Sequence, residues 1–190
     1  MDELRIVGIA GSLRRGSYNR GLVRAAAELA PPGTIVEAFD LGDLPHYNQD
    51  VEDAGDPPSV EALKRAIAGA DALLVATPEY NHGLPGVLKN AIDWASRPAK
   101  ESPLRDKSVA VMGASTGGGA TARAQAQLRD AFVFTGACVM PLPELMIAGA
   151  SHHFDAQGNL TDADLRASLT ELVEALRAWT RRIRLDRAAA

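Results

Sequence analysis

The chain has 190 residues, of which 24 are acidic and 20 basic, so its net charge is −4. This length predicts one domain over residues 1–190, and the mild negative charge argues against nucleic acid or an anionic membrane surface as a partner. The lone cysteine, Cys138, excludes an internal disulfide and a multi-cysteine metal site. Because no basic and apolar leader and no apolar run of about 18 residues is visible, we expect a cytoplasmic protein.

Strand-like and helix-like segments alternate along the chain. Short apolar runs predict five strands, at residues 4–10, 34–39, 71–76, 107–113 and 137–142. Amphipathic patterns predict five helices, at residues 19–29, 58–68, 87–96, 120–134 and 161–185, and residues 40–57 are expected to form a loop. Asn19 and Ser59 are the expected N-caps of the first two helices, and Thr161 with Asp164 resembles a capping box.

This alternation predicts an α/β fold with a doubly wound, five-stranded parallel sheet. Five strands fit the flavodoxin-like order 2-1-3-4-5 better than a six-stranded dinucleotide-binding sheet. In such sheets, ligands bind beyond the carboxyl ends of the strands, near the point where the strand order reverses. The loops after the first, third and fourth strands are therefore the candidate site.

The loop after the first strand has the composition of a phosphate-binding site. It joins a strand to a helix N-terminus, where free amides and the helix dipole favour anions. The candidate residues in it are Gly11, Ser12, Arg14, Ser17 and Asn19. Glycines allow close approach of the backbone, hydroxyl and amide groups donate hydrogen bonds, and the guanidinium neutralises part of a phosphate charge. The alternative is a polar loop whose serines only cap the helix.

Two better-known nucleotide motifs do not match this loop. Gly11 and Gly16 have the spacing of a P-loop, but Ser17 and Tyr18 stand where a lysine and a hydroxyl residue are needed. The dinucleotide fingerprint is also absent, because Gly8 and Gly11 are three positions apart. The loop therefore suits a terminal monophosphate better than a nucleoside triphosphate.

The loop after the third strand, residues 77–86, can present a fixed backbone and one aromatic face to a flat ring. It holds two prolines and two glycines, and Tyr80 supplies the aromatic face. A rigid loop with a purely structural role is the alternative. His82 is better interpreted as a surface residue than as a proton donor.

The loop after the fourth strand offers bare backbone to a planar ligand through Ser115, Thr116, Gly117, Gly118 and Gly119. Residues 113–117 also match the Gly-x-Ser-x-Gly nucleophile elbow of esterases. A triad would need an acidic residue and then a histidine later in the chain, and little chain is left after Ser115 for that arrangement. We therefore assign no side chain a catalytic or metal-binding role, and we interpret Cys138 and Trp94 as packed residues.

Three segments, residues 11–19, 78–81 and 85–94, together closely resemble the NADPH-dependent FMN reductase family, which includes bacterial quinone, chromate and azo-dye reductases. The resemblance extends from about residue 4 to residue 185. It implies that Ser12, Arg14, Ser17 and Asn19 bind the FMN phosphate. It also implies that Pro78, Glu79, Tyr80 and Asn81 lie along the isoalloxazine and that residues 115–119 lie at the ring's other edge.

The resemblance further implies a homodimer, with paired dimers forming a tetramer in many members. In some tetramers an Arg–Tyr–Glu network bridges the dimers. Arg123 and Glu144 match that network, but Ala126 occupies the place of the tyrosine. His82 is a second departure, since many members carry a small or aromatic residue there.

The predicted function is that of an oxidoreductase in which FMN takes hydride from NADPH or NADH and passes electrons to a small acceptor. Quinones, azo dyes, chromate and flavin are the acceptors that the resemblance suggests. A non-enzymatic electron carrier of flavodoxin type is the alternative, although carriers tend to be strongly acidic so that they dock on basic partners. A flavin-binding regulatory protein with negligible turnover is a third possibility.

Overall fold

The computed structural model describes residues 3–188 of the chain. Its strands are β1 (Leu4–Ala10), β2 (Thr34–Phe39), β3 (Ala72–Ala76), β4 (Ser108–Ala114), β5 (Cys138–Val139) and β6 (Leu145–Ile147). Its helices are α1 (Tyr18–Glu28), α2 (Gln49–Asp53), α3 (Pro58–Gly69), α4 (Gly86–Ala95), α5 (Ala122–Thr135) and α6 (Ala163–Ala188), with a short 3-10 helix at Ala150–His152. Within residues 3–188, no helix is both long and apolar enough to span a membrane.

The sheet has the order β2-β1-β3-β4-β5, and every pairing along it is parallel, so the predicted topology is confirmed. The strand order changes direction at β1, which pairs with β2 on one side and with β3 on the other. Every residue of β3 and β4 is buried, as expected for parallel strands covered on both faces.

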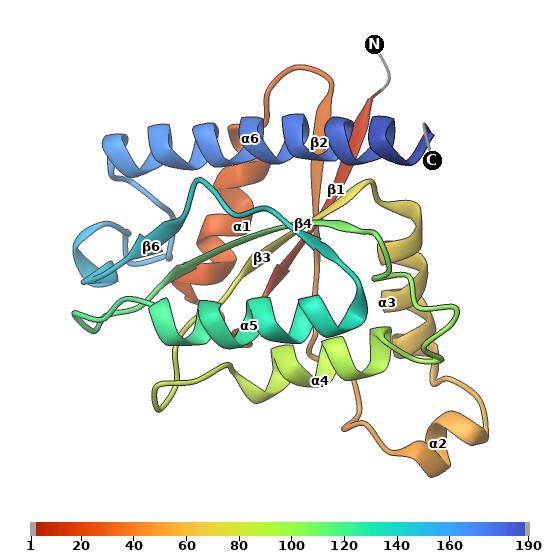
Figure 1. The fold of residues 1–190 in the computed structure, drawn as a ribbon. Helices are drawn as coiled ribbons and strands as arrows, with labels where there is room; N and C mark the ends of the chain where they lie inside the picture. The colour runs from red at the N-terminus through yellow and green to blue at the C-terminus, as the bar shows by residue number, and fades with distance from the viewer. Residues whose placement is uncertain (1–2, 189–190) are drawn as a thin grey trace.

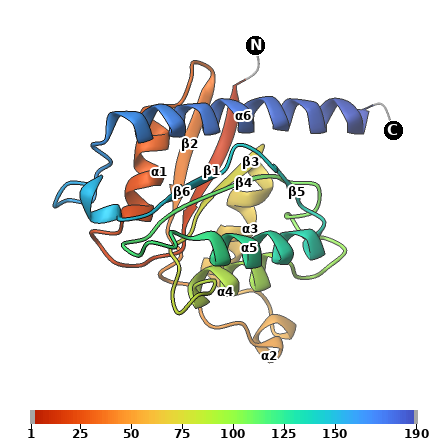
Figure 2. The same ribbon diagram turned by 60° about the vertical axis from the view of Figure 1, so that its left-hand side comes forward.

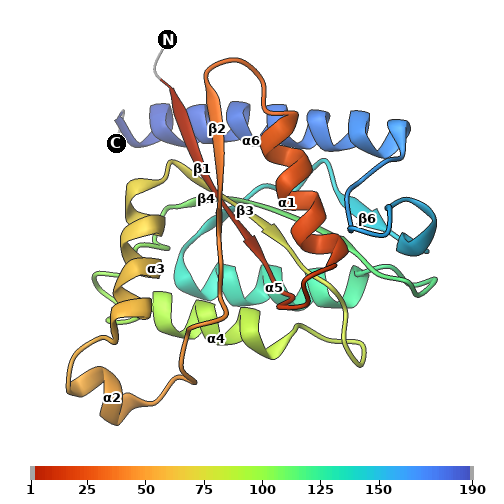
Figure 3. The ribbon, with the colours of Figure 1, turned by 180° about the vertical axis from the view of Figure 1, so that it is seen from behind.

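Helices cover both faces of the sheet. α6 runs along one face together with α1, whereas α3, α4 and α5 cover the other face (Figures 1 and 2). Alternate residues of β1 enter the two cores: Ile6 packs with α1 and α6, and Val7 packs with the other three helices. Seen from behind, β2 is the nearest strand and stands between α1 and α3 (Figure 3).

The predicted fifth strand, residues 137–142, is wrong in its extent. β5 pairs with the start of β4, whereas β6, which was not predicted, pairs with the last three residues of β4. Pro141 and Pro143 stand between the two short strands and lack backbone N–H groups, so a continuous ladder cannot form there. Cys138 is also only partly buried rather than fully packed, and burial raises the pKa of its thiol.

The start of α1 differs from the prediction, because Ser17 rather than Asn19 is its N-cap. The Ser17 hydroxyl accepts a hydrogen bond from the N–H of Arg20 at 3.3 Å. The Asn19 side chain instead donates to the carbonyl of Ala114 and accepts from its N–H, each at 2.9 Å. Asn19 therefore ties α1 to the carboxyl end of β4.

Two other helix starts also differ. α3 begins at Pro58, and no side chain, including that of Ser59, caps it. At α6 the carboxylate of Asp162, rather than Thr161, accepts a hydrogen bond from the N–H of Leu165 at 3.0 Å. A Pro in the first turn needs no hydrogen-bond partner, which makes a side-chain cap less necessary at α3.

The segment predicted as a loop contains α2, which projects from the body of the molecule (Figure 2). Its N-cap Asn48 accepts a hydrogen bond from the N–H of Asp50 at 2.9 Å. None of its residues is buried, so no apolar periodicity could reveal it. Nearby, Trp94 is fully buried and donates its indole N–H to the carbonyl of Pro45 at 2.8 Å, which confirms its packing role.

Candidate functional site

A cavity of about 220 Å³ lies beyond the carboxyl ends of β1, β3 and β4. It is lined by residues of all three predicted loops and of the α1 start: Ser12, Arg14, Ser17, Tyr18, Asn19, Pro78, Glu79, Tyr80, Ala114, Ser115 and Thr116. Tyr18 and Ala114 were not predicted. The predicted residues Gly11, Asn81, Gly117, Gly118 and Gly119 lie outside this lining.

The loop before α1 concentrates positive charge beside free backbone amides. Within residues 3–188, neither Arg14 nor Arg15 has a carboxylate at ion-pair distance. The Arg14 guanidinium lies 5.2 Å from the centre of the Tyr18 ring, at the first turn of α1. Since first-turn amides have no partner inside the helix, this end of the cavity offers the donors and the charge that a phosphate requires.

A tyrosine joins the loops that follow β1 and β3. The Tyr80 hydroxyl donates to the hydroxyl of Ser12 at 3.3 Å, and Ser12 is 95% buried, with 5% of its surface exposed. The Tyr80 ring itself is about half exposed. The same side chain therefore fixes the two loops and leaves an aromatic surface open to a ligand.

A two-residue turn follows Tyr80. The backbones of Tyr80 and Gly83 exchange hydrogen bonds of 3.1 and 2.9 Å, and Asn81 and His82 between them have φ angles of 51° and 60°. Asparagine tolerates this left-handed conformation well, but histidine does so less readily. Both side chains are exposed, in agreement with the interpretation of His82 as a surface residue.

Glu79, which also lines the cavity, anchors its loop to α5 through its carboxylate. Its Oε2 accepts hydrogen bonds from the N–H groups of Arg123 and Ala124 at 3.0 and 3.1 Å, at the start of α5. Burial alone would raise the pKa of Glu79, but these hydrogen bonds and the Arg123 guanidinium outweigh it, so that the pKa is lowered. Thr121, the residue before α5, provides no side-chain cap, so Glu79 fulfils that role from a distant loop.

The loop after β4 does not form an esterase triad. The Ser115 hydroxyl accepts a hydrogen bond from the N–H of Gly117 at 3.2 Å. Among the hydrogen bonds of residues 3–188, none joins Ser115 to a histidine, although His153 bonds through Nδ1 to a carboxylate oxygen of Asp162 at 2.8 Å as a triad histidine would. The exposed residues 116–119 leave bare backbone beside the cavity.

Residues 154–160 form a hairpin that packs against the loop before α1 and against α1 itself. The sequence analysis did not predict this hairpin. A Cβ on Gly21 would lie 1.9 Å from the carbonyl oxygen of Gly158, and a Cβ on Gly158 would lie 3.1 Å from that of Gly16. Arg24 of α1 donates to the Gly158 carbonyl at 3.0 Å and to Oδ1 of Asn159 at 2.9 Å. The turn-forming sequence Asp-Ala-Gln-Gly-Asn was the signal that could have revealed it.

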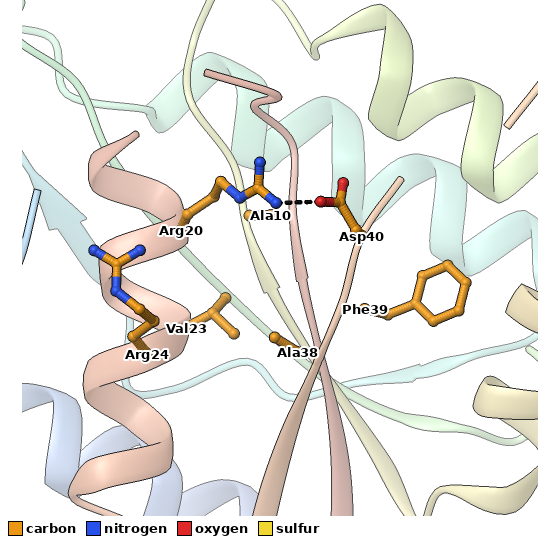
Figure 4. Close-up of a pocket in the computed structure, with 8 residues that line it drawn as sticks. Ala10, Arg20, Val23, Arg24, Ala38, Phe39 and Asp40 are labelled. Atoms are coloured by element: carbon orange, nitrogen blue, oxygen red, sulfur yellow. Dashed lines mark hydrogen bonds and ion pairs between the residues drawn. The ribbon is translucent and has the colours of Figure 1, made fainter. Parts of the chain in front are cut away.

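A second cavity, of about 330 Å³, lies between α1 and β2 at the edge of the sheet. Arg20 and Asp40 point toward each other across it and form an ion pair, while the Phe39 side chain points away (Figure 4). Arg24 is committed to the carbonyls of the hairpin. Because Arg20 and Arg24 are already paired with protein groups, this cavity offers an anion fewer free positive charges than the first cavity does.

Comparison with known proteins identifies relatives along almost the whole chain. A family model described as NADPH-dependent FMN reductase matches residues 4–152. An NAD(P)H-dependent FMN reductase of Pseudomonas aeruginosa is 49% identical over 96% of this chain and 98% of its own length. A 2-hydroxy-1,4-benzoquinone reductase of Burkholderia sp. is 43% identical over 94% of this chain and 97% of its own.

A solved structure shows the same architecture. The chain superposes with a TM-score of 0.85 on FerB, a flavoenzyme NAD(P)H:(acceptor) oxidoreductase of Paracoccus denitrificans. The two are 37% identical, and the match covers 94% of this chain and 98% of the other.

Proposed function

Because the chain belongs to the NADPH-dependent FMN reductase family, and is thus an NAD(P)H-dependent reductase, we propose that FMN binds in the cavity beyond β1, β3 and β4 and that quinones accept its electrons. The observation that carries this proposal is the convergence of three loops on one cavity, with uncompensated arginines and free helix amides at one end. These residues fit the group that the family implies, since a phosphate needs cationic and N–H donors and a ring needs a flat, accessible surface.

The loop before α1 would hold the phosphate. Ser12 and Ser17 can donate through their hydroxyls, Arg14 supplies charge, and the first-turn amides of α1 supply backbone donors. Asn19 contributes differently from the prediction, because its side chain is already bonded to Ala114. Its part is to hold the helix N-terminus against β4, with only its backbone N–H available to an anion.

Two loops would hold the ring. Residues 78–80 and 114–116 both line the cavity and lie at or after the ends of two neighbouring strands, β3 and β4. Tyr80 offers an aromatic surface, and the loop after β4 offers backbone without large side chains. Glu79 keeps the first of these loops in place through α5, so we assign it a positioning role.

When bound, FMN supplies the ring that takes up a hydride and passes electrons on. The chain's own residues bind and orient it, and no side-chain nucleophile is assigned. NADPH and NADH are both proposed as hydride donors. The relative named 2-hydroxy-1,4-benzoquinone reductase favours quinones as acceptors, with azo dyes, chromate and free flavin as further candidates.

We also propose that the protein is a cytoplasmic homodimer. Large apolar side chains stand exposed at the end of α5 and after β5: Val133 at 70%, Phe134 at 94% and Leu142 at 71%. Such side chains favour burial against another subunit. The two residues that match the tetramer network have partners inside the chain, since Arg123 pairs with Glu79 and Glu144 with Arg129.

The test is a titration of the apoprotein with FMN, followed by anaerobic addition of NADPH and then of benzoquinone. We expect saturable flavin binding, bleaching of the flavin absorbance by NADPH alone, and its recovery with the quinone. Bound flavin that NADPH cannot bleach would instead indicate an electron carrier. Absence of flavin binding would contradict the assignment of the cavity.

A further inference from the structure

A third cavity, of about 430 Å³, lies at the end of the sheet opposite the proposed flavin site. Residues of α6, of the end of α3 and of the segment before β4 line it. Its charged lining residues are Asp71, Arg105, Asp106, Lys107, Arg184 and Arg187. Four cations thus face two carboxylates, and the cavity carries an excess of positive charge in a protein whose net charge is −4.

Only part of this positive charge is balanced by protein groups. Arg184 forms an ion pair with Asp71, and Arg187 lies 3.3 Å from a carboxylate oxygen of Asp106. Over residues 3–188, Arg105 has no carboxylate within ion-pair distance and no side-chain hydrogen bond. The two unbalanced charges are therefore those of Arg105 and Lys107.

Lys107 is held in a setting that disfavours its charge. Its ammonium donates to the carbonyl of Ala70, a neutral partner, and an ammonium has three N–H groups to satisfy. Burial lowers the pKa of Lys107; Asp71 opposes this effect, whereas Arg184 and Arg187 lower the pKa further. An anion in the cavity would supply the missing acceptor and offset the mutual repulsion of these cations.

Ser108 adds a neutral donor that has no partner in the part of the chain described. It is the first residue of β4 and is 98% buried, with 2% of its surface exposed. By alternation it faces the same side as Ala110 and Met112, toward α6, and it lines this cavity. Its hydroxyl makes no side-chain hydrogen bond within residues 3–188, so it is available to a ligand in this cavity.

We propose that this cavity binds a small dianion of the phosphate class, held by Lys107, Arg105 and the hydroxyl of Ser108. The excess of two positive charges matches a dianion, and the combination of ammonium, guanidinium and hydroxyl matches phosphate oxygens. β4 connects the two sites, beginning at this cavity with Ser108 and ending at the proposed flavin cavity with Ala114. A strand of that length spans roughly 20 Å, so the two ligands would not collide.

The test is calorimetric titration of FMN-saturated protein with inorganic phosphate at low ionic strength, so that the proposed FMN phosphate site is already filled. We expect saturable binding at one site. Arg105→Gln removes a charged hydrogen bond and should weaken it by about tenfold. Ser108→Ala should also weaken binding, yet leave the melting temperature in phosphate-free buffer unchanged or higher, because it removes an unpartnered hydroxyl.

The matched control is Arg65→Gln, which removes the same charge from an exposed ion pair on α3. It should change the phosphate affinity by less than about twofold, since exposed charges are strongly screened. Three results would each overturn the proposal: no saturable heat with wild-type protein, equal binding of acetate at matched ionic strength, or equal weakening by Arg65→Gln and Arg105→Gln. The outcome does not depend on whether the flavin is reduced by NADPH.

Discussion

Arg14 is the residue on which the proposed phosphate contact depends most. It lines the cavity, has no carboxylate partner in residues 3–188 and stacks near Tyr18. A charge-assisted hydrogen bond to phosphate contributes about 1.5–3 kcal/mol. Arg14→Gln should therefore weaken FMN binding by roughly tenfold to a hundredfold.

Flavin fluorescence titrations measure this effect, and riboflavin provides the control because it has no phosphate. The affinity for riboflavin should be nearly the same in Arg14→Gln as in the wild type. Equal losses for FMN and riboflavin would show that Arg14 supports the ring or the fold rather than the phosphate.

Glu79 allows a prediction about pH. Its pKa is lowered in the folded protein, so the stability that it contributes is present at neutral pH and is lost as the pH falls through and below the usual glutamate value of about 4.3. Glu79→Gln removes the charged cap of α5 and should cost about 1 kcal/mol at pH 7. Urea denaturation at pH 7 and at pH 3.5 should show a difference from wild type that shrinks at the lower pH. A difference that stays constant would contradict this role.

At the scale of single residues, local signals predicted which residues gather at the site but not how each is used. The loop composition singled out Ser12, Arg14 and Tyr80, and all three line one cavity. The partners of Asn19 and Glu79 lie 95 and 45 positions away, at Ala114 and Ala124, and local sequence rules cannot see such pairs. A capping asparagine and a bridging asparagine look identical in sequence.

At the scale of elements, the hairpin at residues 154–160 positions the loop before α1. Glycine to alanine in a helix interior normally stabilises by about 0.5–1 kcal/mol. Gly21→Ala should do the opposite, because its Cβ would lie 1.9 Å from the Gly158 carbonyl and one of the two elements must shift. We expect a lower melting temperature and weaker FMN binding.

Gly69→Ala is the matched control, since Gly69 is also helical and has open space where a Cβ would stand. It should leave FMN binding unchanged and the melting temperature equal or higher. If Gly21→Ala lowered stability without changing the FMN affinity, the hairpin would support the fold but not the site.

The order of the elements was predictable because buried parallel strands are short apolar runs between amphipathic helices. The strands at the edge of the sheet that follows β4 were harder to predict. β5 and β6 together hold few residues, and the prolines between them interrupt the apolar run from which one longer strand was predicted. α2 was missed for a related reason: a short helix with no buried residue has no periodic apolar face by which the sequence could reveal it.

At the scale of the whole molecule, the exposed apolar end of α5 bears on assembly. Arg129 donates to the Met140 carbonyl at 2.8 Å, which holds the segment after β5 against α5. Val133 lies one turn further along the same helix, and Phe134 next to it is almost fully exposed. If these side chains are buried between subunits, charging one of them should dissociate the dimer.

Phe134→Lys should therefore halve the mass that light scattering measures during size exclusion, while the melting transition remains cooperative. Leu185→Lys is the control: Leu185 is 70% exposed on α6, apart from α5, and its replacement should leave the mass unchanged. If the wild-type protein is a monomer, or if Phe134→Lys remains a dimer, the apolar end of α5 is not the dimer interface. The same samples can show whether FMN affinity falls with dissociation, which would place the second subunit beside the flavin.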